Sequence, residues 1–325
     1  MKNYLKGTLF FGIGALFTFT VVSFYNPVKQ EKPQSQIFYL DEPNKEIDLN
    51  KFSSEYRIIP PDIPENITFC GEDVPLNEFE VRERFQREII VNTYWHSASI
   101  LLLQRSTRWF PIIEPILKEH GIPDDFKYLA AIESNLINAV SPAGATGFWQ
   151  FMKGSGKEYG LEINDEVDER YHLEKATVAA CNYLKDAKEK FGTWTLAAAS
   201  YNRGMSGIDK QLDRQKEETF YDMLLNEETS RYIFRILAMK ELFERPRDFG
   251  FYLTEDDFHK PIRTKVVLVN SSITHLGDFA KKNGISYKLL KYFNPWLRDI
   301  TLTNKSTKPV MSNISRILKF IFSTA

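Results

Sequence analysis

An uncharged apolar stretch lies near the beginning of the chain. Lys2 and Lys6 precede it, and its most apolar part runs from Leu9 to Tyr25. A helix needs roughly 20 residues to span the hydrocarbon core of a bilayer, and positive residues before such a stretch favour export of the residues after it. The pattern predicts a signal anchor or a cleaved signal peptide over residues 1–26. Under both alternatives the rest of the chain is extracytoplasmic, in the periplasm or cell envelope.

Residues 27–78 lack a sustained hydrophobic period and are rich in proline and polar residues. This composition is typical of an extended linker. We therefore expect an extracytoplasmic linker here, with a short ordered stretch near Ile67–Pro75. The thiol of Cys70 falls in that stretch, and no neighbouring motif suggests a catalytic role for it.

From Phe79 onward, apolar residues recur at helical spacing. The spacing predicts one helix over Phe79–Arg105 and a second over Phe110–Leu117. A third helix begins at Pro123, where two aspartates follow the proline, because anionic groups stabilise the N-terminus of a helix. The pattern predicts a mainly helical domain over residues 79–250.

Glu133 interrupts the apolar face of the third helix. It continues the row formed by Phe126, Leu129 and Ala130, where a core residue is expected. Burial and the negative end of the helix dipole both disfavour the ionised carboxylate and raise its pKa above the usual value of about 4.3. Such an acid can protonate a leaving group near neutral pH. The alternative is a glutamate that only caps the helix or forms a salt bridge.

The segment after Glu133 contains no carboxylate before Glu158. It combines glycines and other small residues with Phe148, Trp149 and Phe151, whose flat faces suit either sugar rings or a core. Ordinary retaining and inverting glycosidases place two carboxylates around the bond that they cleave. One glutamate without an obvious partner is therefore an unusual site.

The pattern becomes mixed after residue 250. A strand is predicted over Thr264–Asn270, then a helix around Ile273–Lys282 and a second helix that ends near Phe293. The next apolar run, Ile300–Thr303, is short for a closing strand. The remaining residues, 305–325, carry four apolar side chains at helical spacing: Ile314, Ile317, Leu318 and Ile321.

Composition excludes several classes of function. The 325 residues include 42 Lys and Arg against 43 Asp and Glu, a net charge of −1, so no nucleic-acid partner is expected. Two cysteines without paired Cys or His spacing offer neither a disulfide scaffold nor a zinc site. HExxH and GxSxG motifs are missing, so neither a metalloprotease nor a serine hydrolase is indicated. We expect no metal and no cofactor.

Four motifs occur in order along the middle of the chain. They are Glu133-Ser134, Gly144–Met152, Ala199–Gly204 and Glu228–Tyr232. Together they resemble the soluble-lytic-transglycosylase (SLT) domain of the lytic murein transglycosylases, over roughly Thr107 to Glu241. The resemblance implies a mainly α, lysozyme-like (goose-type) catalytic domain that cleaves the MurNAc-β-1,4-GlcNAc bond of peptidoglycan.

The same resemblance accounts for the single carboxylate. In this family one glutamate protonates the glycosidic oxygen and then accepts the proton of the muramyl C6 hydroxyl, which attacks C1 and gives a 1,6-anhydroMurNAc end. Glu133 matches this catalytic residue. The positions that match substrate-binding residues are Ser134, Phe148, Gln150, Met152, Tyr201, Asn202, Glu228 and Tyr232. In the third motif, Ser200 stands where the family commonly has alanine.

Residues 251–304 resemble a LysM-like peptidoglycan-binding segment, a small α/β unit. The resemblance rests on the strand–helix–helix order and on Leu276, Ala280, Gly284 and Asn294-Pro295. Because no clear closing strand comes after them, we expect the module to be incomplete and residues 305–325 to form a tail outside it.

Two alternatives to a lytic transglycosylase stay open. A muramidase on the same fold would use water as nucleophile and would need a second carboxylate, for which Asp165, Glu166 and Asp168 are distant candidates. A non-catalytic wall-binding protein would have no use for a buried acid, which costs stability to desolvate. The expected partners are peptidoglycan glycan strands and, through an uncleaved N-terminal segment, the membrane.

Overall fold

The structure is a computed structural model that describes residues 58–269, 271–303 and 316–321. The expected signal segment, residues 1–26, and residues 27–57 of the expected linker lie outside the described residues. Within the described part, no helix is both long enough and apolar enough to cross a bilayer.

Helices make up most of the described chain, as the pattern predicts. The elements are β1 Thr68–Phe69, β2 Glu72–Asp73, α2 Phe79–Tyr94, α3 His96–Glu119, α4 Phe126–Ser134, α5 Lys153–Glu158, η1 Glu169–Tyr171, α6 Leu173–Phe191, α7 Trp194–Arg203, α8 Met205–Gln215, α9 Glu227–Glu244, η2 Pro246–Phe249, η3 Glu255–Asp257, β3 Thr264–Val269, α10 Leu276–Lys282, α11 Tyr287–Phe293 and β4 Arg316–Ile321.

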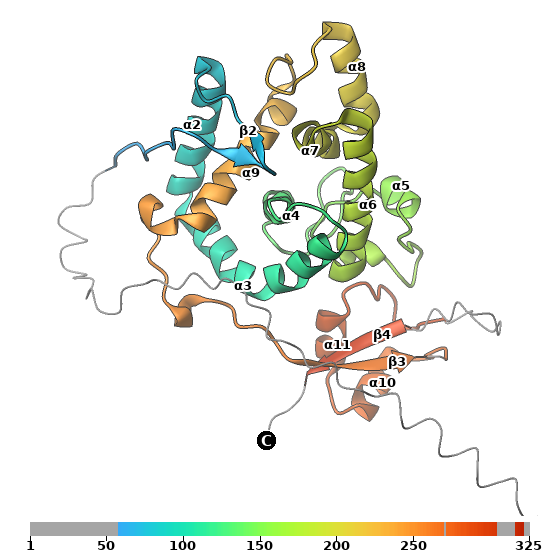
Figure 1. Cartoon of the computed structure of the whole chain (residues 1–325). Helices are drawn as coiled ribbons and strands as arrows, with labels where there is room; N and C mark the ends of the chain where they lie inside the picture. Colours follow the sequence, from blue (N-terminus) through green and yellow to red (C-terminus); the bar gives the residue numbers. More distant parts are fainter. Residues whose placement is uncertain (1–57, 270, 304–315, 322–325) are drawn as a thin grey trace, which may run out of the picture. The chain divides into compact units, whose positions relative to one another are not determined.

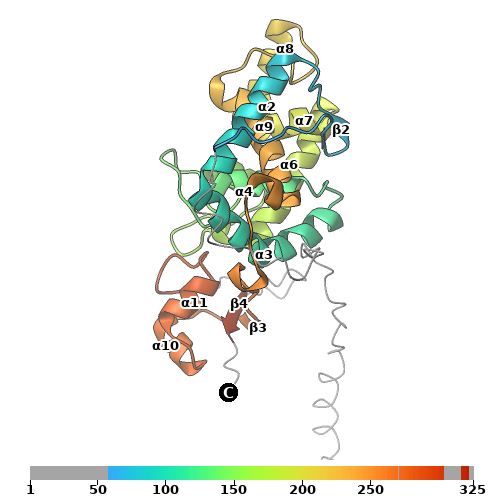
Figure 2. The same cartoon turned by 90° about the vertical axis from the view of Figure 1, so that its left-hand side faces the viewer.

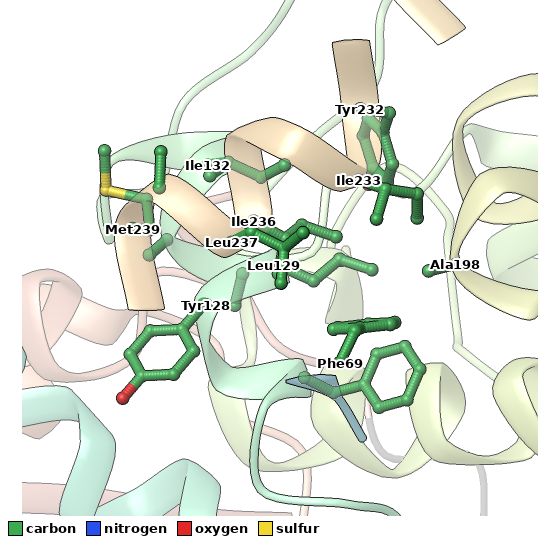
Figure 3. Close-up of a cluster of buried hydrophobic side chains, with 14 of the residues drawn as sticks. Phe69, Tyr128, Leu129, Ile132, Ala198, Tyr232, Ile233, Ile236, Leu237 and Met239 are labelled. Carbon is green, nitrogen blue, oxygen red and sulfur yellow. The ribbon is translucent and has the colours of Figure 1, made fainter. Parts of the chain in front are cut away.

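Helix α4 lies inside a ring formed by the other helices (Figure 1). Leu129, Ala130 and Ala131 are fully buried, and two alanines in succession let neighbouring helices approach closely. Helix α9 packs against α4 and runs alongside α2 (Figures 1 and 2). The apolar side chains of α4 and α9 form one cluster (Figure 3). The helix that carries Glu133 is therefore the central helix of the fold.

The first two helices divide at a different place from the one predicted. The structure ends α2 at Tyr94 and begins α3 at His96, with only Trp95 between them, and α3 continues without a break to Glu119. The apolar spacing does not mark this break, because both helices bury the same kind of face. Pro111 lies inside α3, where it removes one backbone donor but does not end the helix.

The short hairpin formed by β1 and β2 is part of the helical body. Its side chain Phe69 is fully buried, and Ile67, Val74 and Leu76 beside it are buried in the same core as the helices. The ordered stretch expected near Ile67–Pro75 is therefore present. The folded body begins before residue 79, because these side chains complete its core.

The C-terminal module is closed by a strand that the pattern did not predict. Strand β4 pairs antiparallel with β3, with Thr264 opposite Ile321 and Val269 opposite Arg316. The expectation of a tail outside the module is wrong for Arg316–Ile321, which forms this strand despite the helical spacing of its apolar residues. A few apolar residues fit either period, and β-branched isoleucine favours a strand when a partner edge is available. A separate hydrophobic core, which includes Leu276, Ala280, Leu290 and Leu302, lies in this module.

Candidate active site

Glu133 lies in the last turn of α4. The helix ends because Asn135 adopts a left-handed conformation, with φ 52°, and its N–H donates to the Ala131 carbonyl at 2.9 Å. Asparagine is one of the few residues besides glycine that enters this region readily. The early end leaves Glu133 half-buried at the negative end of the helix dipole.

The surroundings of Glu133 favour its protonated form. Burial is the main cause and raises the pKa of this carboxyl, and the negative charge of Glu228 raises it further. The Tyr232 hydroxyl donates to Oε1 of Glu133, and the Arg235 charge is close, so both act in the opposite direction without reversing the shift. The pKa of Glu133 is therefore raised, as the sequence analysis predicted, and desolvation is the largest cause.

Two tyrosines lie around Glu133: Tyr232 is buried and Tyr201 is half-buried. Tyr232 reaches it from α9 and Tyr201 lies on α7, where its hydroxyl donates to the Trp149 carbonyl at 2.8 Å. Burial, followed by the charge of Glu133, raises the pKa of both phenols well above the usual value. Both hydroxyls therefore keep their protons across the physiological range, and Tyr232 is a permanent hydrogen-bond donor to the acid.

The loop between α4 and α5 folds tightly beneath the site. Gly147 has φ +84°, and a Cβ at this position would lie 1.9 Å from the Arg170 carbonyl oxygen, so only glycine fits. Gln150 donates its amide hydrogens to the carbonyls of Gly147, at 2.7 Å, and Ala139, at 3.1 Å. The side-chain amide of Gln150 thus joins two parts of the loop and stabilises its conformation.

Asn202 connects α7 to the beginning of α9. Its Nδ2 donates to Glu228 Oε1 at 3.2 Å, and its Oδ1 accepts from the Thr229 hydroxyl at 2.9 Å. This contact orients the carboxylate of Glu228, the one carboxylate whose charge raises the pKa of Glu133. The structure therefore brings together five of the residues selected from the sequence: Glu133, Tyr201, Asn202, Glu228 and Tyr232.

Three other selected residues have different surroundings. The Ser134 hydroxyl donates back to the Ala130 carbonyl at 3.1 Å, within its own helix. Phe148 is buried edge-on against Trp109 and lines a cavity of about 320 Å³ whose lining does not include Glu133. Met152 is exposed just before α5. Their role in substrate binding remains a prediction.

The distant carboxylates considered for a muramidase have other partners. Glu166 accepts hydrogen bonds from the hydroxyls of Thr301 and Thr303, both at 2.9 Å. Asp168 forms an ion pair with Arg170, with 2.7 Å between Oδ2 and the guanidinium. Asp165 is exposed. None of the three contributes to the pKa of Glu133.

Candidate metal ligands and thiols do not gather elsewhere in the described residues. No group of three or more His, Cys, Asp or Glu side chains in that part of the chain could hold a metal ion. Burial raises the pKa of the Cys181 thiol to about 12, and burial likewise raises that of Cys70. Neither thiol is activated for nucleophilic chemistry.

Arg235 was missed by the sequence reasoning. It follows Tyr232 by three residues on α9, so both side chains lie on one face of the helix. Its guanidinium donates to the Ile132 carbonyl at 3.0 Å and affects the pKa of Glu133. The sequence could have indicated Arg235 through its spacing of three residues from Tyr232 of the fourth motif.

Two family models match parts of this chain. Residues 110–224 match the family model of the transglycosylase SLT domain. The chain carries an SLT domain. Residues 265–314 match a second model, the soluble lytic transglycosylase C-terminal LysM-like domain. Both resemblances expected from the sequence are confirmed. Glu228 and Tyr232 lie after the matched part of the SLT domain, yet Tyr232 contacts the acid within it.

Two curated relatives are similar over most of the chain. Each is a membrane-bound lytic murein transglycosylase D, one from Escherichia coli strain K12 and one from Escherichia coli O6:H1 strain CFT073. Each is 28% identical to this chain over 253 residues, which cover 75% of this chain and 54% of the relative. The chain therefore spans about half the length of the curated relatives that it matches.

Proposed function

We propose that the chain is a peptidoglycan lytic transglycosylase in which Glu133 is the single acid and base. The observation that carries the proposal is the enclosed carboxyl group of Glu133, with its pKa raised by burial and a tyrosine hydroxyl held on one of its oxygens. The SLT domain and the named activity of the relatives support the same reaction.

In the first step, protonated Glu133 donates its proton to the oxygen of the MurNAc–GlcNAc bond. The bond between C1 of MurNAc and that oxygen breaks, the GlcNAc end leaves as an alcohol, and positive charge develops at C1. Because its pKa is raised, Glu133 keeps this proton to a higher pH than an exposed glutamate does. The negative charge of Glu228, oriented by Asn202, favours this positive centre.

In the second step, the carboxylate of Glu133 accepts the proton of the muramyl C6 hydroxyl. The oxygen of that hydroxyl bonds to C1 and forms the 1,6-anhydro ring, so Glu133 returns to its protonated state. Tyr232 donates a hydrogen bond to the carboxylate and stabilises its charged form between the two steps. Because the nucleophile belongs to the substrate, no second carboxylate is needed to activate water.

The rest of the chain fits a protein of the cell envelope. We propose that the LysM-like domain binds peptidoglycan glycan strands and that residues 1–26 direct the chain out of the cytoplasm, as an anchor or a cleaved signal. Residues 27–78 would then lead from the membrane to the catalytic domain and include the hairpin that completes its core. The relatives' description as membrane-bound supports an envelope location.

The test is to digest purified peptidoglycan with the full-length protein, kept in mild detergent, and to identify the products by mass spectrometry. The wild-type protein should release 1,6-anhydro muropeptides. Glu133→Gln should reduce release at least about a thousandfold, the upper part of what general acid–base groups supply. Glu158→Gln is the matched control, because Glu158 is an exposed glutamate of the same domain.

Each other outcome has a defined meaning. Reducing-end products instead of anhydro products would assign a muramidase, with Glu228 as the first candidate for activating water. Wall binding without any release would assign a binding protein. Unchanged release by Glu133→Gln would overturn Glu133 as the acid.

A further inference from the structure

Three separate helices carry the groups of the proposed site. Glu133 lies on α4, Tyr201 lies on α7 and Tyr232 lies on α9, so their relative positions depend on how three distant segments are held together. The hairpin of residues 68–73, which we call the clasp hairpin, contacts all three helices. We propose that the clasp hairpin sets the geometry of the active site and that Glu72 is its positioning residue. This inference rests on the proposed function.

The contact with α7 is made by Glu72. Its Oε1 accepts from the Trp194 N–H at 2.6 Å, and its Oε2 accepts from both the N–H and the hydroxyl of Thr195, at 2.8 Å and 2.7 Å. Lys188 adds an ion pair at 3.1 Å. These N–H groups are the first of α7 and have no partner within the helix. A carboxylate from a distant segment therefore caps the helix that carries Tyr201 and Asn202.

The contact with α4 is made at the turn of the hairpin. The Cys70 N–H donates to Asp125 Oδ2 at 2.7 Å, and Asp125 is the N-cap residue just before α4. The ring of Phe69 lies edge-on to Phe126, the first residue of α4, with 5.4 Å between centroids. The hairpin thus holds the N-terminal end of the helix that presents Glu133 at its other end.

The contact with α9 is made by Lys240. Its ammonium group donates to the Thr68 carbonyl at 3.0 Å and to Asp125 Oδ2 at 2.9 Å. The same lysine thus joins the hairpin, the beginning of α4 and helix α9. Figure 3 shows Phe69 in the same cluster as Leu129 of α4, Ala198 of α7 and Ile233 of α9.

The turn sequence fixes which side chains enter the body. Cys70 has φ 53° and Gly71 has φ 81°, and positive φ at both central residues is the requirement of a two-residue type I′ hairpin turn. In the resulting register Phe69 pairs with Glu72. Paired residues lie on the same face of a hairpin, so the buried ring and the capping carboxylate enter the body together.

The charge of Glu72 suits this role. Burial alone would raise its pKa, but the hydrogen bonds from Trp194 and Thr195 outweigh burial and hold the pKa of this carboxyl below its usual value. Glu72 therefore stays ionised at the pH at which Glu133 is protonated. A negative charge at the N-terminus of α7 also interacts favourably with the helix dipole.

The test compares Glu72→Ala, Glu72→Gln and the control Asp73→Ala in the full-length protein. Asp73 is exposed on the same strand. For Glu72→Ala we expect anhydro-product release at saturating peptidoglycan to fall by between about tenfold and a hundredfold, since a displacement of ~1 Å at a site can cost about a hundredfold. The amount of protein bound to the wall should stay the same. Glu72→Gln keeps one acceptor oxygen and should restore part of the rate, whereas Asp73→Ala should match the wild type.

Hydrogen exchange measured by mass spectrometry provides a readout independent of turnover. Loss of the clasp should speed exchange in α4, α7 and α9 together, although these helices are separate in sequence. Exchange that changes only in residues 68–73 and the first turn of α7 would overturn the proposal, and so would an unchanged rate of release in Glu72→Ala. If Glu72→Ala does not fold, the same comparison with Glu72→Gln decides. If the wild type releases nothing, the proposed function fails, and the exchange pattern alone decides whether the clasp exists.

Discussion

The hydrogen bond from Tyr232 to Glu133 leads to a prediction about the pH dependence of turnover. The bond stabilises the ionised form of Glu133 and so lowers the pKa that burial raises. Tyr232→Phe removes only the hydroxyl and keeps the buried ring. Without the bond, the pKa of Glu133 rises further, and Glu133 keeps its proton to a higher pH.

The size of the effect depends on the chemistry of the contact. A hydrogen bond to a charged group contributes ~1.5–3 kcal/mol, and each pH unit corresponds to about 1.36 kcal/mol. The alkaline limb of the pH–rate profile, where the acid loses its proton, should therefore move upward by roughly 1 to 2 pH units in Tyr232→Phe. The maximal rate should fall by about tenfold, because the carboxylate loses the contact that orients it.

The assay is anhydro-muropeptide release from purified peptidoglycan between pH 4 and pH 10. Tyr128→Phe is the control, since Tyr128 is a buried tyrosine of α4 whose hydroxyl does not bind Glu133. An alkaline limb that stays in place or moves to lower pH in Tyr232→Phe would refute the electrostatic role of the hydroxyl. A limb that moves equally in the control would show that any loss of a buried hydroxyl produces the shift.

Three further predictions concern stability, each measured by urea unfolding. Gly147→Ala should lower the free energy of unfolding by about 3 kcal/mol, because its Cβ would lie 1.9 Å from the Arg170 carbonyl oxygen. Arg231→Ala should lower it by about 2 kcal/mol, because buried Glu88 loses one of the two guanidinium groups that bind it and keeps only that of Arg87. Glu72→Gln should be less stable than wild type at neutral pH, and the difference should vanish as the pH falls below 4.5 through the lowered pKa of Glu72, because a carboxyl with a depressed pKa stabilises the fold only while it is ionised.

Matched variants separate the causes in these tests. Gly144 has φ +86° but open space around the position of a Cβ, so Gly144→Ala measures the backbone cost alone. Equal losses in Gly144→Ala and Gly147→Ala would contradict the predicted clash. Asp73→Asn is the control on the same strand, and a pH-dependent difference from wild type as large as that of Glu72→Gln would remove the special role of Glu72.

The central helix and the raised pKa of Glu133 were predictable because their signals are local. A proline followed by two aspartates precedes α4, and a single glutamate on an apolar face marks the candidate site within the nine residues of that helix. The contact between Tyr232 and Glu133 spans 99 residues. No period in the sequence encodes such a pairing, so only the resemblance of the fourth motif to a known family indicated that Tyr232 belongs to the site.

The sequence predicted an ordered stretch near Ile67–Pro75, but it predicted neither the hairpin within that stretch nor the closing strand, and the two reasons differ. Each strand of the hairpin has only two residues, too few to show a period, and its partners on α7 lie more than a hundred residues away. Strand β4 shows a period that fits a helix as well as a strand. Its conformation depends on β3, whose edge offers hydrogen bonds that the tail sequence alone does not reveal.

The contact between Lys240 and the Thr68 carbonyl has a consequence for how the chain folds. It joins residues separated by 172 positions, and contacts of such long range form slowly because a large loop must close first. The clasp hairpin has no docking site until α7 and α9 are in place. A chain that has not yet folded therefore has Glu133 in water, with no tyrosine beside it. The carboxyl group of Glu133 acquires its raised pKa only when the whole helical body has assembled, so the proposed activity needs the complete fold.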